Sequence, residues 1–177
     1  ELRMLLGDEV NIRPPSALIP TLHSLQGTVR VDRATAPLRV SLELSEAQVS
    51  IAWEDDPCIL AKACKTDAEI SATQEAHLRD GAAMVEFLTW LDAQAPDTIT
   101  EIDVVTALEG FRRAGNDLLD ISFETIAGTG PHGAIMHYRV TNESNAMLKD
   151  GEIIVVDSGG QYIDGTTDIT RTVPIGR

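Results

Sequence analysis

Residues 151–172 read GEIIVVDSGGQYIDGTTDITRT, and the second half of the chain is organised around them. The apolar run Ile153–Val156 is typical of a buried strand, which carries the carboxylate of Asp157 at its end. Asp164-Gly165 is a strong hairpin signal, and the threonine-rich segment after it, which contains Asp168, favours a second strand. The sequence therefore predicts a β-hairpin with one aspartate on each arm.

The register of this hairpin determines whether the two aspartates can cooperate. A two-residue turn at Asp164-Gly165 would leave Asp157 and Asp168 about four residues apart along the strands, roughly 13 Å, which is too far for a shared ligand. A turn centred on Tyr162-Ile163, with a bulge at Gly159-Gly160, would set the aspartates directly opposite each other with Cβ atoms about 5 Å apart. The pattern allows both registers, and we expect the second.

Two facing carboxylates repel each other unless a proton or a cation lies between them, so the pair indicates a divalent metal site. The alternative is a solvated hairpin tip with ordinary turn aspartates. A calcium loop of the EF-hand type is disfavoured, because it needs flanking helices and a glutamate at the position where Asp168 stands. Ser158 is not expected to be a nucleophile, since no matching histidine segment precedes it.

Two segments of the hairpin, DSGGQY (Asp157–Tyr162) and DGTTDITRT (Asp164–Thr172), closely resemble the metal-binding hairpin of aminopeptidase P. These Xaa-Pro aminopeptidases belong to the pita-bread metallopeptidases. The segments GAIMHYR (Gly133–Arg139) and AHLRDGAA (Ala76–Ala83) resemble the same family. The resemblance extends over about residues 56–176 and implies the first half of a pita-bread fold.

This resemblance implies a dinuclear-metal peptidase that releases the N-terminal residue from peptides with proline in second position. Asp157 and Asp168 would be metal ligands, and His137 would be a catalytic residue close to the scissile carbonyl. Thr170 and Arg171 would orient the Asp168 arm. The implied cofactors are two divalent metal ions, manganese first, with cobalt and zinc as alternatives. No other cofactor-binding residue is predicted.

Alternatives to this function remain open. Prolidase, methionine aminopeptidase and other pita-bread peptidases share the paired aspartates, although the segment DGTTD favours aminopeptidase P. A non-catalytic pita-bread protein that binds a partner is the alternative from another class. A lone histidine is more often structural than functional. The resemblance alone therefore assigns His137 its role, and it assigns none to His77 or His132.

The composition limits the partners of the chain. It carries 28 Asp and Glu against 14 Lys and Arg, a net charge of −14. Nucleic acid and anionic membranes are not expected as partners, because both are bound through basic patches. No apolar run approaches the ~18 residues of a membrane span, and no signal peptide opens the chain, so we expect a cytoplasmic protein. The expected partner is a peptide substrate, and a homodimer is compatible with the sequence.

Both ends of the chain predict an internal fragment of a longer protein. It begins at Glu1 without a methionine and stops at Arg177, directly after a strand. In the family the remaining metal ligands, a histidine and two glutamates, would follow that point. We therefore expect the chain alone to be inactive. The cysteines Cys58 and Cys64 have neither zinc nor redox spacing and are expected to be free thiols that are buried or half-buried.

Two domains are predicted. Residues 1–56 are expected to be the C-terminal part of an upstream α/β domain, because a β-α-β unit is indicated there by Thr28–Asp32, Ala34–Gln48 and Val49–Trp53. Residues 57–177 are expected to be the N-terminal half of the pita-bread catalytic domain.

The second domain should begin with helices. Thr66 and Glu69 form a capping box, and the helix that follows is expected to run about 28 residues, up to Pro96. Thr98 and Glu101 indicate a second capping box and a shorter helix.

Strands should follow these helices, at Ile121–Ile126 and at Ala134–Val140, the second carrying His137. Helices followed by strands and a hairpin predict an α+β fold. In such a fold the helices cover one face of a mainly antiparallel sheet.

Overall fold

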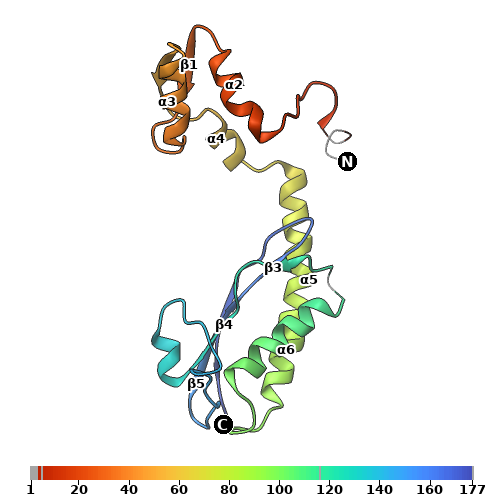
Figure 1. The fold of residues 1–177 in the computed structure, drawn as a ribbon. Coiled ribbons are helices and arrows are strands. Elements are labelled where there is room, and N and C mark those ends of the chain that lie inside the picture. Colours follow the sequence, from red (N-terminus) through yellow and green to blue (C-terminus); the bar gives the residue numbers. More distant parts are fainter. Residues whose placement is uncertain (1–3, 5, 116, 177) are drawn as a thin grey trace. The chain divides into compact units, whose positions relative to one another are not determined.

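The computed structural model describes residue 4, residues 6–115 and residues 117–176. Within it the chain divides into two compact units, Glu1–Cys64 and Lys65–Arg177 (Figure 1). The sequence-based domain bounds, 1–56 and 57–177, stay a prediction. Among the described helices, none is both long enough and apolar enough to cross a membrane.

The N-terminal unit contains the expected β-α-β arrangement. Strand β1 (Thr28–Val31) pairs in parallel with β2 (Ser50–Trp53), and α3 (Leu38–Glu46) connects them. Pro37 is the N-cap of α3 and so directly precedes its first turn. The unit also contains η1 (Pro15–Ala17), α2 (Leu18–His23) and α4 (Cys58–Ala63). Cys58 and Cys64 are free thiols, but their expected burial was wrong, because both are exposed and α4 has no buried residue.

Helix α5 (Asp67–Asp92, 26 residues) begins as predicted. The backbone N–H of Glu69 donates to the Thr66 hydroxyl, and the N–H of Thr66 donates to the Glu69 carboxylate at 2.8 Å. The capping box is therefore confirmed. The helix ends at Asp92, a few residues before Pro96.

Helix α6 (Glu101–Arg113) begins later than predicted. Its N-cap is Thr100, whose partner in the capping box is Asp103, so the prediction of a box from Thr98 to Glu101 was wrong. The physical reason is that both residues have other partners. The Thr98 hydroxyl donates to a carbonyl on its N-terminal side, and the carboxylate of Glu101 is fully buried, where it accepts long-range hydrogen bonds.

The sheets of the C-terminal unit are antiparallel. Strand β5 (Ile153–Ser158) lies between β4 (Ile126–Thr129) and β7 (Ile169–Pro174), and the short strands β3 (Asp120–Ile121) and β6 (Gly160–Gln161) form a separate pair. Figure 1 shows α5 and α6 running beside these strands. The α+β architecture with a mainly antiparallel sheet is confirmed.

Two predicted strands take another form. The expected strand Ile121–Ile126 is divided into β3 and β4. The expected strand Ala134–Val140 is absent from the described residues, because η2 (Gly130–Ala134) and a turn occupy this part of the chain. Pro131 suits the first turn of such a helix. A Cβ atom on Gly128 would lie 2.9 Å from the His132 carbonyl carbon, so the chain folds back closely onto β4.

The core of the C-terminal unit lies between the two long helices and one face of the sheet. Ile154 and Val156 of β5 are fully buried, whereas Ile153 is 52% exposed. Alternation along the strand therefore gives a helix-covered face and an open face, and Asp157 lies on the open one. The buried members of the core are Met84, Phe87, Leu91, Val104, Leu108, Ala127, Leu148, Ile154, Val156 and Ile175.

Removing the N-cap of α5 should lower stability. We expect Thr66→Ala to reduce the free energy of unfolding by about 1 kcal/mol, because the N–H of Glu69 loses its acceptor. Urea denaturation followed by circular dichroism measures the change. Thr89→Ala is the matched control, since Thr89 is exposed on the same helix and only donates to the preceding turn. Equal losses in both variants would contradict a capping role for Thr66.

Candidate metal and substrate site

The register of the hairpin places the two aspartates on one face of the sheet. Asp157 lies opposite Thr170, and Asp168 precedes Thr170 by two residues, so alternation puts both aspartates on the open face. They are diagonal neighbours, a relation in which Cα atoms are about 7 to 8 Å apart. The prediction that Asp157 lies directly opposite Asp168 was therefore wrong, and so was the 13 Å alternative. The observed register lies between the two.

A tight tip sets this register. The N–H of Tyr162 donates to the Gly165 carbonyl at 2.8 Å, and Gln161 pairs with Thr166, so Ile163 and Asp164 form the tip. The same register continues from the tip into β5 and β7, without the expected bulge.

Gly159 and Gly160, on the first arm of the hairpin, allow close packing of the chain. A Cβ atom on Gly159 would lie 1.9 Å from the carbonyl oxygen of Thr167 and 2.3 Å from the Ser122 hydroxyl. A Cβ atom on Gly160 would lie 2.7 Å from a Leu118 methyl carbon. A residue with a side chain is thus excluded at both positions of this arm unless its surroundings move.

A methyl group at Gly159 should displace the hairpin. We expect Gly159→Ala to lower the free energy of unfolding by about 2 to 3 kcal/mol, because the rigid Thr167 backbone has to move. Urea denaturation measures this. Gly81→Ala is the control: open space surrounds Gly81 in the middle of α5, so alanine should raise stability by up to about 1 kcal/mol. A neutral Gly159→Ala would show that the hairpin tolerates the displacement.

A buried charge network fixes the tip of the hairpin to the helices. Arg112 of α6 donates to both oxygens of Asp80 of α5, at 2.8 and 3.1 Å, and the Tyr162 hydroxyl donates to Asp80 at 2.6 Å. Nearby, Arg79 donates to Asp164 at 2.5 Å. Both members of the Asp80–Arg112 pair are fully buried. This end of the hairpin is therefore held by charged groups and not by apolar packing alone.

The network changes the acidity of its members. Burial raises the pKa of Asp80, but the hydrogen bonds from Arg112 and Tyr162 outweigh burial and leave this pKa below its usual value. Burial, together with the hydrogen bond to Asp80, raises the pKa of Tyr162 well above the usual value. The carboxylate and the protonated phenol are thus the stable forms in the folded state.

Removing the charge of Asp80 should destabilise the protein in a pH-dependent way. At pH 7 we expect Asp80→Asn to cost about 3 to 5 kcal/mol, because Arg112 is left buried without its counter-ion. Since folding lowers the pKa of Asp80, the unfolded chain binds its proton more readily. The advantage of the wild type is therefore complete above the unfolded pKa of about 3.9 and is lost as the pH falls through the lower folded value.

Urea denaturation between pH 7 and pH 2 tests this expectation. Glu86→Gln, on the exposed side of α5, is the control and should show little difference from the wild type at any pH. A difference between wild type and Asp80→Asn that stays constant down to pH 2 would contradict a stabilising charge on Asp80.

The predicted metal ligands differ in their surroundings. Asp157 is partly buried, and the Thr170 hydroxyl donates to its Oδ1 atom at 2.7 Å. Asp168 is exposed. Thr170 thus orients the Asp157 carboxylate, whereas it was expected to orient the arm that carries Asp168. Ser158 points away from both, since it is fully buried on the helix-covered face.

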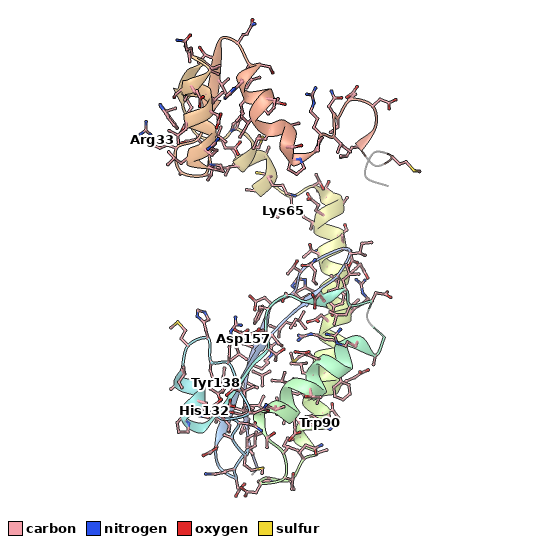
Figure 2. All side chains as sticks on the ribbon, in the orientation of Figure 1. Arg33, Lys65, Trp90, His132, Tyr138 and Asp157 are labelled. Carbon is pink, nitrogen blue, oxygen red and sulfur yellow. The ribbon has the colours of Figure 1, made fainter. Side chains whose placement is uncertain are left out.

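His137 lies in an exposed turn after η2. Its backbone φ of 57° is in the left-handed region, which residues other than glycine seldom adopt. The next residue, Tyr138, is buried, and its ring stacks on the His132 ring with centroids 4.5 Å apart. Figure 2 shows these two rings together near one end of the sheet, with Asp157 further along it.

The sequence does not reveal a central residue of this region, Glu101. It was expected only as a helix cap, yet its buried carboxylate accepts hydrogen bonds from the segment that contains His137. Its backbone partners, Thr129 and Ala146, lie 28 and 45 residues away along the chain. A local pattern carries no signal for contacts at that range.

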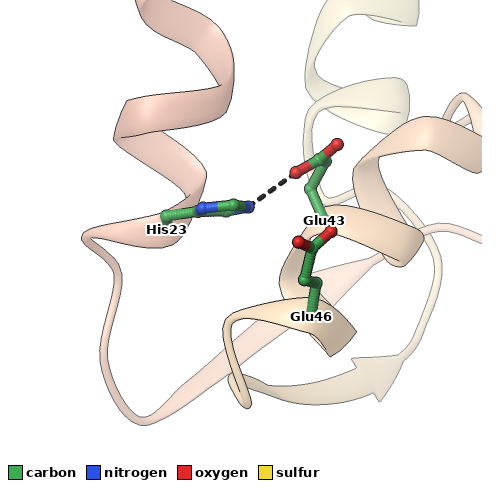
Figure 3. Close-up of side chains that lie close together, drawn as sticks. All are labelled: His23, Glu43 and Glu46. Atoms are coloured by element: carbon green, nitrogen blue, oxygen red, sulfur yellow. Dashed lines mark hydrogen bonds and ion pairs between the residues drawn. The ribbon is translucent and has the colours of Figure 1, made fainter.

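The N-terminal unit holds a cluster of one imidazole and two carboxylates, His23, Glu43 and Glu46 (Figure 3). Within the described residues it is the only group of three or more possible metal-binding side chains that comes this close together. Glu43 is 3% exposed, lies 2.6 Å from His23 Nε2 and is also paired with Arg39. Since Arg39 already balances the charge of Glu43, the cluster serves as an internal link between α2 and α3.

Sequence comparison agrees with this fold and hairpin. Residues 71–177 match metallopeptidase family M24. The chain belongs to this family. This match, together with the similar proteins described below, confirms the predicted resemblance to aminopeptidase P and a partial pita-bread fold.

Individual M24 proteins extend the comparison. The chain is 36% identical to a probable Xaa-Pro aminopeptidase P of Laccaria bicolor over 96% of its length, and 46% identical to a peptidase of Schizosaccharomyces pombe over 68%. It spans only 27% and 20% of these two relatives.

A solved M24 structure is also similar. It is an X-prolyl aminopeptidase from Caenorhabditis elegans, described as a cytosolic enzyme with a di-nuclear active site. The TM-score is 0.64 at 25% identity, covering 82% of this chain and 32% of that one.

Proposed function

We propose that this chain forms part of a metal-dependent Xaa-Pro aminopeptidase, which releases the N-terminal residue from peptides with proline in second position. The observation that carries the proposal is the register of the hairpin. It brings Asp157 and Asp168 within one diagonal step on the open face of the sheet. Membership of the M24 family and the similarity to Xaa-Pro aminopeptidases support the reaction class.

The donor set suits hard or borderline divalent ions. Two carboxylates this close together are stabilised by a cation, and their oxygens are ligands that manganese, cobalt and zinc accept. When bound, a pair of such ions would polarise the scissile carbonyl and supply an activated water. Among the described residues no third ligand joins Asp157 and Asp168. We therefore propose that the remaining ligands come from further residues of the full-length protein, outside residues 57–177.

The chain's own residues have separate roles in this proposal. Asp157 and Asp168 hold the ions, and Thr170 keeps the Asp157 carboxylate in one orientation through its hydroxyl. His137 contacts the substrate near the scissile bond. Its strained backbone supports this role, because such conformations concentrate at functional sites. By analogy with the Caenorhabditis elegans enzyme, described as cytosolic, we place the protein in the cytoplasm.

Metal content and hydrolysis of the full-length protein test the proposal. We expect manganese to be bound and Xaa-Pro-containing oligopeptides to be cleaved. Asp157→Asn and Asp168→Asn should each lower kcat more than the about 10- to 100-fold typical of residues that only orient a ligand. Asp92→Asn, exposed at the end of α5, is the control and should leave kcat unchanged.

Other outcomes distinguish the alternatives. Cleavage of Xaa-Pro dipeptides but not of longer peptides would identify a prolidase. Hydrolysis that survives a strong chelator, or full activity in Asp168→Asn, would remove the paired aspartates from the mechanism. The 177-residue chain alone should bind manganese weakly and show no turnover, because water and loosely held cations alone offset the repulsion between the aspartates.

A further inference from the structure

Glu101 is a fully buried carboxylate at the first position of α6. One oxygen, Oε1, accepts from the Thr129 backbone N–H at 2.8 Å and lies 2.9 Å from His132 Nδ1. The other oxygen, Oε2, accepts from the Tyr138 hydroxyl at 2.9 Å and from the Ala146 backbone N–H at 3.1 Å. A buried carboxylate is costly unless hydrogen-bonded, and here both oxygens are satisfied.

These contacts join both ends of one segment. Thr129 and His132 lie at the start of residues 129–146, and Tyr138 and Ala146 lie in its second half. His137 lies between the anchored parts and directly precedes the buried Tyr138.

Further long-range contacts hold the two ends of this segment, since the Thr129 hydroxyl donates to Glu152 and the Asn145 side chain accepts from the Ile102 N–H. Arg139 also pairs with Glu124 at the surface, whereas the bonds between Thr141 and Ser144 are local. Among these groups, the carboxylate of Glu101 is the one that contacts the segment both before and after His137.

The pattern of donors requires a carboxylate at this position. Each oxygen of Glu101 faces one backbone N–H, which can only donate. A glutamine has one accepting and one donating end. Whichever way its amide turns, its NH₂ group would meet either the Thr129 N–H or the Ala146 N–H, and a buried donor would be left unsatisfied. The tyrosine hydroxyl and the imidazole can reverse their roles, but the two backbone groups cannot.

We propose that Glu101 is the positioning residue that holds His137 in its left-handed conformation at the substrate site. The inference rests on the proposed function only for the catalytic consequence. A strained backbone persists only where its surroundings over-determine it. The anchors on both sides of His137, at Thr129 and His132 and at Tyr138 and Ala146, supply that constraint. The location of Glu101 at the N-terminal end of α6 adds to it, because that end of a helix favours a negative charge.

Hydrogen exchange of the full-length protein tests the positioning itself. In Glu101→Gln, peptides from residues 129–146 should exchange at least about 10-fold faster, because one end of the segment is released, while β5 and β7 keep their protection. Asp103→Ala is the matched control. It removes the capping partner of Thr100 from the same helical turn without touching the segment. Unchanged exchange over residues 129–146 in Glu101→Gln would overturn the proposal.

Kinetics with an Xaa-Pro peptide test the consequence for His137. Glu101→Gln should lower kcat and kcat/KM together by about 10- to 100-fold, as expected for an interaction made in the transition state. In a His137→Ala background the same change should have almost no further effect, because the residues act through one another. Asp103→Ala should keep kcat within about 2-fold of the wild-type value, although it destabilises α6 to a similar extent as Glu101→Gln. Additive losses in the double variant would reduce Glu101 to a structural residue and overturn the proposal.

A milder variant covers the case in which Glu101→Gln fails to fold. Tyr138→Phe removes one of the four contacts and keeps the ring stacked on His132. It should shift exchange and kcat in the same direction by a smaller factor, and an unchanged Tyr138→Phe would then overturn the proposal. If the wild type cleaves no Xaa-Pro peptide, the proposed function fails, and hydrogen exchange alone decides the role of Glu101.

Discussion

The pairing of β5 with β7 is the constraint on which the C-terminal unit depends. Because side chains alternate along a strand, a slip of one residue would exchange the two faces of the sheet. In the observed register Ile154 and Val156 enter the core below α5 and α6, and Asp157 stays on the open face. Burial of the apolar face therefore fixes the orientation of the carboxylates. The hydrophobic core and the candidate site are two consequences of one pairing.

Two buried carboxylates on the helices hold loop segments of the C-terminal unit in place through hydrogen bonds. Asp80 of α5 fixes the tip of the hairpin through Tyr162, and Glu101 of α6 fixes the segment that contains His137. Neither charge is isolated: Asp80 has the guanidinium of Arg112, and Glu101 has donors on both oxygens. Truncating either carboxylate would strand its partners in the interior, which costs more than a surface pair contributes. The loops thus gain a defined geometry that apolar contacts alone would not give.

The sequence predicts the parts of the fold that depend on neighbours in the chain. The capping box at Thr66 involves residues three positions apart, and the β-α-β unit and the hairpin follow from local patterns. Local patterns do not determine the register, because two turns separated by one residue differ little in local energy. Tertiary contacts of the tip, such as the one between Tyr162 and Asp80, 82 residues apart, therefore weigh in the outcome. Local patterns miss the role of Glu101 for the same reason. The position of Glu101 three residues after Thr98 suits a capping box, but its burial among donors from distant residues overrides that local preference.

The strand expected at Ala134–Val140 shows how tertiary contacts override a local preference. Its residues Ile135 to Val140 suit a strand, yet a strand would place His137 in an extended backbone. The observed turn gives His137 a left-handed φ and leaves it exposed, while Tyr138 is drawn into the interior by Glu101 and the His132 ring. His137 thus stays at the surface while the next residue, Tyr138, is held in the interior. The four hydrogen-bonding contacts of the Glu101 carboxylate outweigh the local preference for a strand. The surrounding structure therefore maintains the left-handed conformation of His137.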